Sequence, residues 1–169
     1  MANQTPVSSL IGANLSATTT TQLFALGTRL EATDGTVWQF VQATGTFTTG
    51  YLVNINPTGT AFALTSALLQ SPGVQGVDIG VAQGVISEDE YGWVATKGRN
   101  LYVLCTGTCT GGAQVAVGAG TGRLQNAEAA GVSATMQGIY ITTSASTATA
   151  SVAVATLTWP RSIAVGNLG

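Results

Sequence analysis

The chain contains no histidine, and it has only five basic and seven acidic residues among 169. Histidine is the commonest general base and the commonest zinc ligand, so its absence excludes Ser–His–Asp, Cys–His and His-based metal chemistry. Lys97 is the single lysine and the one possible partner for a Ser–Lys dyad. The sequence therefore predicts a protein that is not an enzyme, with no catalytic residues, no metal site and no cofactor.

Positive charge and long apolar runs are both scarce. Five basic residues and a net charge of −2 provide no basic patch for phosphates, so we expect no nucleic-acid partner. Thr, Ser, Asn, Gln and Gly interrupt every uncharged stretch, which leaves no apolar run of the roughly 18 residues that a membrane span needs. The beginning of the chain also lacks the basic and apolar regions of a secretory signal. We therefore expect no membrane partner.

Apolar residues make up 45% of the chain, which is enough for one buried core. Because few side chains are charged, only hydroxyls and amides are left to keep the surface hydrated. We therefore expect copies of the chain or a larger assembly to cover much of that surface. A Thr-rich monomer is the alternative, since exposed Thr is common on sheet faces.

Alternating apolar and polar residues predict short β-strands along most of the chain. Tyr51 to Ile55 show the pattern most clearly. Gly-rich turns separate the strands, so the fold class is all-β, a sandwich or barrel of short antiparallel strands with an extended N-terminal arm. The other candidate strands are Phe24–Glu31, Thr36–Ala43, Val77–Val85, Tyr91–Thr96, Leu101–Cys105, Val115–Val117, Met136–Thr142 and Val152–Trp159.

Two local signals are more specific. Asp34-Gly35 predicts a hairpin with a type I′ turn, because this dipeptide tolerates positive φ angles. Ala61–Gln70 is the one helix candidate, since its leucines could form an apolar stripe before Ser71-Pro72-Gly73.

Residues 1–22 lack periodicity and contain four consecutive threonines, so we interpret them as an extended arm before a single β-domain of residues 23–169. An arm of this kind orders on contact with a neighbour. Its candidate contact residues are Thr5, Pro6, Leu10, Ile11 and Leu15.

Two polar motifs are more simply explained by loops than by ligand sites. Gly118 to Arg123 is glycine-rich, but no Lys-Ser/Thr pair follows, so a turn between two strands is the better interpretation. Glu88-Asp89-Glu90 could attract Ca²⁺, yet the ligand spacing of an EF-hand is missing and a solvated loop explains the charges.

Cys105 and Cys109 enclose three residues, a gap that a disulfide could span across a tight turn. Two free thiols fit the sequence equally well, because a cytoplasmic assembly site would keep them reduced. Without histidine, two sulfurs form a poor zinc site.

Aromatic residues gather in Trp38-Gln-Phe40 and Tyr91-Gly-Trp93, where the spacing places each pair on one side of a strand. Such a stripe is either part of the core or an exposed platform for a sugar or protein partner. As a platform, it would consist of Trp38, Tyr91 and Trp93.

Three segments together resemble the capsid cement or decoration proteins of tailed bacteriophages: Leu26–Ala43, then Ile79–Gly84 running into Tyr91–Val94 and Gly98, and finally Trp159–Ser162. The resemblance covers roughly residues 26–162, and the arm is not matched. It implies an all-β virion structural protein on the outer capsid surface, assembled in the host cytoplasm. Such a protein commonly forms a homotrimer that bridges neighbouring subunits of the major capsid protein.

We therefore expect a cement protein whose partners are the major capsid protein and other copies of itself. The alternative is a phage head-fibre or tail adhesin module that binds a host glycan or receptor through the aromatic platform.

Overall fold

The computed structural model describes residues 13–65, 78–118, 122–127 and 134–164, and most of them lie in strands. The all-β class is thereby confirmed. All ten strands belong to one sheet. In chain order they are β1 (Arg29–Glu31), β2 (Val37–Ala43), β3 (Leu52–Ile55), β4 (Thr60–Ala63), β5 (Asp78–Ala82), β6 (Tyr91–Cys109), β7 (Val115–Val117), β8 (Leu124–Asn126), β9 (Ala134–Thr143) and β10 (Ala145–Ala164).

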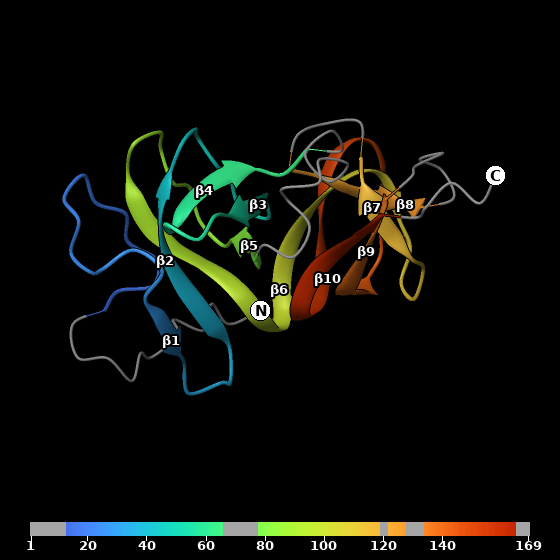
Figure 1. The fold of residues 1–169 in the computed structure, drawn as a ribbon. Helices are drawn as coiled ribbons and strands as arrows, with labels where there is room; N and C mark the ends of the chain where they lie inside the picture. The colour runs from blue at the N-terminus through green and yellow to red at the C-terminus, as the bar shows by residue number, and fades with distance from the viewer. Residues whose placement is uncertain (1–12, 66–77, 119–121, 128–133, 165–169) are drawn as a thin grey trace.

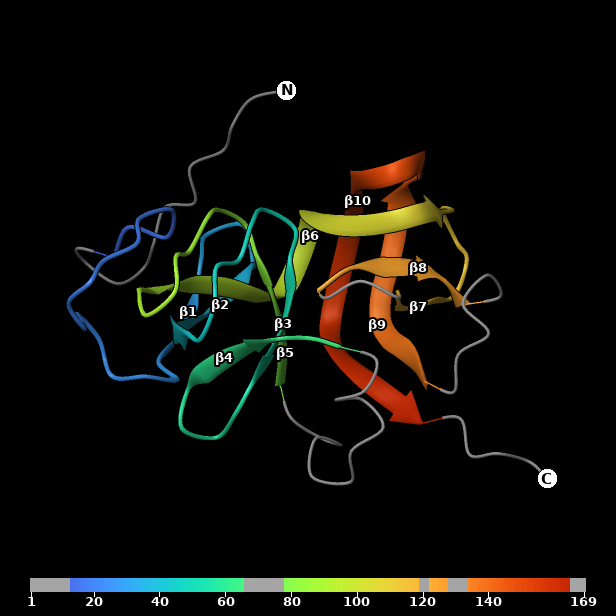
Figure 2. The same ribbon diagram turned by 90° about the horizontal axis from the view of Figure 1, so that it is seen from above.

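The sheet closes on itself twice, and β6 belongs to both closures (Figures 1 and 2). In the first barrel, β2 pairs with β4 and with β6, while β3 and β5 complete the circle. In the second barrel, β6 pairs with β10 and β8, while β9 and β7 complete the circle. Figure 2 shows β1 to β5 on one side of β6 and β7 to β10 on the other.

The expectation of short antiparallel strands holds for most of the sheet, with two departures. Strands β6 and β10 contain 19 and 20 residues, and the pairs β2–β4 and β6–β8 are parallel. The sequence predicts separate strands at Tyr91–Thr96 and Leu101–Cys105, but β6 continues through both with a β-bulge between them. Gly98 pairs with Leu157 and Leu101 with Ala155, which leaves one extra residue on β6. Asn100 accommodates the bulge with a φ of 56°. One strand can thus pass from the first barrel into the second.

The first barrel has a narrow interior. Its core cluster consists of Phe47 and eight small or medium residues: Val41, Ala43, Val53, Ile55, Ala61, Ala82, Ile86 and Val94. Glycines occupy the most crowded wall positions, since a Cβ on Gly80 would lie 2.7 Å from a methyl of Val94 and one on Gly92 would lie 2.9 Å from Ile86.

A larger cluster joins the two barrels. It contains Leu52 and Val81 from the first barrel and Val103, Leu124 and Ala155 from the second. Backbone hydrogen bonds cross the same boundary, from Leu104 N–H to the Gly50 carbonyl at 2.7 Å and from Leu52 N–H to the Gly122 carbonyl at 2.9 Å. The barrels therefore share apolar packing and backbone pairing.

Two local predictions need correction. The Asp34-Gly35 hairpin joins β1 and β2 as expected, but its turn is not type I′, because Gly35 has a φ of 78° whereas Asp34 is not among the positive-φ residues. A turn closed by Gly35 N–H and the Ala32 carbonyl, followed by the left-handed glycine, replaces it. The helix candidate is wrong for Ala61 to Ala63, which form β4 because β3 pairs with them; residues 66–70 lie outside the described part.

Candidate functional site

Exposed apolar side chains occur on the outside of the second barrel. Along β6 and β10 the odd-numbered residues Leu101, Val103, Ala153 and Ala155 are buried. Their even-numbered neighbours Tyr102, Val152 and Val154 lie on the other face and are more exposed, whereas Leu104 is buried as well. Among these, Tyr102 is 45% exposed and Val152 is 48% exposed, and Val154 pairs directly with Tyr102 across the two strands. We call Tyr102, Val152 and Val154 the outer strip. It is apolar apart from one hydroxyl and carries no charge.

The backbone beneath the outer strip is held in place by Gln83. Its amide accepts a hydrogen bond from the Tyr102 N–H at 2.9 Å and donates one to the Tyr102 carbonyl at 3.0 Å. A side chain from the first barrel thus satisfies the backbone of β6 at the position where Tyr102 points outward.

A pocket of about 660 Å³, within the size range of small-molecule sites, opens beside the middle of β9. Three segments line it: the loop Gly112 to Gln114, strand β9 from Met136 to Tyr140, and Thr158 with Trp159 on β10. None of these lining residues is charged. Tyr140 and Trp159 are 59% and 39% exposed, so two aromatic rings are available at this pocket.

A wide bulge in β10 places Trp159 at the pocket. Leu157 pairs with Ile139 and Arg161 with Gln137, so three residues of β10 lie opposite Gly138 alone. Trp159 has a φ of 56°, a conformation that bulky side chains rarely adopt. Bulges commonly redirect a side chain next to a functional site.

Arg29, on β1 beside the first barrel, holds the orientation of the Trp159 ring. Its guanidinium carbon lies over the indole, 5.4 Å from the ring centroid. The same guanidinium forms an ion pair with Asp78 on β5, which balances its charge. The ring at the pocket is therefore oriented by both its own backbone and a cation on β1.

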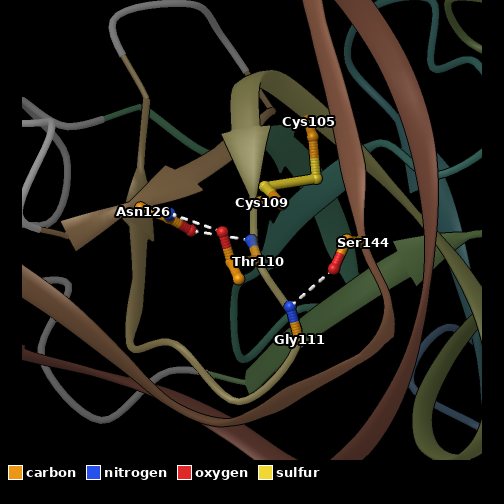
Figure 3. Close-up of a disulfide and its surroundings, with 6 residues drawn as sticks. All are labelled: Cys105, Cys109, Thr110, Gly111, Asn126 and Ser144. Atoms are coloured by element: carbon orange, nitrogen blue, oxygen red, sulfur yellow. Dashed lines mark hydrogen bonds between the residues drawn. A yellow bond between two sulfur atoms is a disulfide. The ribbon is translucent and has the colours of Figure 1, made fainter.

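The loop Gly112 to Gln114, which forms one wall of the pocket, comes shortly after a disulfide in the sequence (Figure 3). Cys105 and Cys109 are joined with their Cα atoms 6.2 Å apart, about half the span of four extended residues, so the end of β6 is sharply bent. Thr110 and Gly111 follow immediately. Asn126 accepts a hydrogen bond from the Thr110 N–H at 2.9 Å, and Ser144 accepts one from the Gly111 N–H at 2.9 Å. These contacts hold the loop that leads to Gln114.

Of the two interpretations of the aromatic residues, the core interpretation holds. Trp38 and Trp93 are 5% and 4% exposed and belong to the larger cluster. Phe24 covers this side of β2 and β6, with its ring centroid 5.3 Å from those of both Phe40 and Trp93. Tyr91 is half-buried and stacks on Phe40. The alternative of an exposed platform of Trp38, Tyr91 and Trp93 therefore does not hold, because both tryptophans are buried and Phe24 packs against Trp93.

Leu15 is also a core residue and not a contact for a neighbour. It is 5% exposed within the larger cluster. Thr19 and Tyr91 exchange two backbone hydrogen bonds, of 3.0 and 2.8 Å, so this part of the arm adds to β6 of its own chain. The other candidate contacts, Thr5, Pro6, Leu10 and Ile11, lie outside the described residues.

The acidic run Glu88-Asp89-Glu90 has a local structural role. Glu90 accepts a hydrogen bond from the Ser87 N–H at 3.1 Å. That bond, followed by one from the Thr18 hydroxyl, holds the pKa of the Glu90 carboxyl below its usual value. In the part of the chain that the structure describes, no three Cys, Asp or Glu side chains are grouped to hold a metal ion. On either side of the glycine-rich segment Gly118 to Arg123, β7 and β8 pair in antiparallel orientation, and the Gly118 N–H donates to the Arg123 carbonyl at 2.8 Å. Residues 119–121 lie outside the described part.

No protein-family model, curated protein or solved structure matches the chain. The description of the site therefore depends on its own geometry. Across the described ranges, no helix is long and apolar enough to cross a membrane.

Sequence reasoning missed both the outer strip and the pocket. The alternation in Leu101–Cys105 and Val152–Trp159 predicts two faces for each strand, but not which face the rest of the chain covers. The Trp159-Pro160 pair at the end of a strand was the available signal for a bulge, because proline is disfavoured within a regular ladder.

Proposed function

We propose that this protein is a virion structural protein that binds the outer surface of a tailed-phage capsid and bridges neighbouring subunits of the major capsid protein. It works as a homotrimer. It has no catalytic role, and it needs no cofactor, nucleic acid or membrane.

The outer strip is the observation that carries this proposal. It presents Tyr102 and Val152 on paired strands, which is a firm and uncharged surface. A repeated interface between uncharged surfaces avoids the desolvation cost of burying unpaired ions in every copy. Many modest contacts of this type add up through avidity when the partner is a regular shell.

The resemblance to cement proteins supports the same partner. Its three segments fall on β1 and β2, on β5 and the start of β6, and on the bulge of β10. They therefore include strands of both barrels and the junction between them. The scarcity of charge, five basic and seven acidic residues, fits a surface that is covered in the assembled state.

Co-sedimentation with undecorated capsids of the parent phage tests the proposal. The intact protein is expected to bind saturably at a fixed copy number per capsid, and light scattering of the protein alone is expected to give the mass of a trimer. Tyr102→Glu should weaken capsid binding by about tenfold or more, because it buries an unpaired charge.

Phe62→Glu is the matched control. Phe62 is 38% exposed but lies on β4 of the first barrel. The Phe62→Glu variant should bind the capsid as tightly as the unchanged protein does. Absence of binding by folded protein would refute the capsid partner, whereas equal binding by both variants would refute the outer strip as the contact surface.

A further inference from the structure

We propose that the pocket between β9, the β10 bulge and the loop Gly112 to Gln114 is a binding site for a neutral saccharide. This inference goes beyond capsid binding, because it concerns a different surface and a different kind of ligand.

The two rings at the pocket provide stacking surfaces. Trp159 and Tyr140 both line it, and both remain partly open to solvent. A pyranose ring has one face of C–H groups, which packs well against an aromatic face. Arg29 lies over the indole. A sugar therefore stacks on the face that Arg29 leaves free.

The polar groups at the pocket match hydroxyls and not ions. Gln114 and Gln137 bring amides, and Thr158 brings a hydroxyl. Amides and hydroxyls both donate and accept hydrogen bonds, as sugar hydroxyls do. None of the ten described lining residues is charged and Arg29 is paired with Asp78, so no side chain in the described lining compensates a charged ligand. The preferred ligand is therefore uncharged.

The pocket is also preorganised. The backbone of Trp159 is held in a rare conformation by the bulge opposite Gly138. Across the pocket, the disulfide and the hydrogen bonds that the Thr110 and Gly111 N–H groups donate to Asn126 and Ser144 hold the loop before Gln114. A rigid aromatic side chain costs little entropy when a ligand binds, so even a shallow site gains affinity from it.

The test uses the full chain and three neutral probes: maltotriose, cellotriose and tri-N-acetylchitotriose, with 3′-sialyllactose as an anionic comparison. Binding is followed by tryptophan fluorescence and by saturation-transfer NMR. At least one neutral probe is expected to bind saturably and to change the fluorescence. Trp38 and Trp93 are buried, so the responding tryptophan is Trp159.

Trp159→Ala and Tyr140→Ala should each weaken that binding by about tenfold. Tyr140 is the more exposed ring and lies outside the bulge, so its variant tests the site even if the tryptophan variant fails to fold. Tyr102→Ala removes an aromatic of similar exposure from the outer strip and should leave sugar binding unchanged.

Three outcomes would overturn the inference: no saturable binding by any neutral probe, tighter binding of the anionic probe, or equal affinity in the Tyr140→Ala variant. If the unchanged protein bound no sugar and Trp159→Ala lost capsid binding, the pocket would be a contact site for the capsid and not a saccharide site.

Discussion

A Cβ built on Gly138 would lie 2.8 Å from the carbonyl oxygen of Thr158, so only glycine fits opposite the bulge that carries Trp159. Gly138 also has a φ of 79°, which L-residues rarely adopt. Gly138→Ala should therefore lower the free energy of unfolding by roughly 1–3 kcal/mol and change the fluorescence of Trp159. Gly45→Ala is the control, because a Cβ there meets nothing within 4 Å. Equal stability of the two variants in urea would contradict this account.

Arg29 positions the Trp159 ring without lining the pocket. Arg29→Met keeps an aliphatic side chain but removes the cation over the indole and the ion pair with Asp78. We expect sugar affinity to fall several-fold and Trp159 emission to shift, while the free energy of unfolding changes by less than about 1 kcal/mol. Arg99→Met, at another exposed position, serves as the comparison. A loss of stability without any spectral change would mean that Arg29 acts only in folding.

The Cys105–Cys109 disulfide should stabilise the second barrel modestly. It closes a loop with only three residues between the cysteines, for which the chain-entropy model gives about 2 kcal/mol. Cys105→Ala/Cys109→Ala should lower the urea midpoint by a corresponding amount and weaken binding at the pocket, since the loop to Gln114 follows the bond. Alkylation with and without reductant, read by mass spectrometry, should reveal two protected thiols. Two reactive thiols in the oxidised protein would contradict the bond.

Glu90 should titrate below the range of an ordinary glutamate. Its pKa is lowered because Ser87 N–H and then the Thr18 hydroxyl donate to the ionised carboxylate. A carboxyl whose pKa is lowered on folding adds stability above its unfolded pKa, and this contribution is lost as the pH falls through the folded value. The amide signal of Ser87 should follow that titration in NMR. Glu90→Gln should abolish the response; a midpoint at or above that of a free glutamate peptide would show that these two donors do not stabilise the carboxylate.

Leu15 should contribute to folding as a core residue. Leu15→Ala is expected to cost roughly 2–3 kcal/mol, because the side chain is 5% exposed in the larger cluster. Leu23→Ala removes an equally large side chain that is 65% exposed, and it should cost almost nothing. Chemical denaturation of both variants measures the difference. If Leu15→Ala were as stable as Leu23→Ala, the segment would not be part of the folded core.

Much of the secondary structure could be predicted from local pattern. Val115–Val117 forms a strand with the expected bounds, and Thr36–Ala43 differs from β2 by one residue. The leucines after Ala61 favour a helix in place of β4, and Leu124 is the one apolar residue of β8, so alternation revealed neither of these short strands. The disulfide was one of two open alternatives, since the spacing of Cys105 and Cys109 does not determine whether the chain bends enough to bring them together.

The sequence by itself determined the chemical character of this protein. A chain with no histidine and few ions has no His-based chemistry, and alternating Val, Ile and Thr between glycines form strands. Tertiary structure alone decided which face of each strand stays exposed. Trp38 and Trp93 are buried, with Phe24 packed against Trp93, whereas Tyr102, Tyr140 and Trp159 remain open. The physical reason is that alternation divides a strand into two faces, but burial depends on distant segments that pack against one of them.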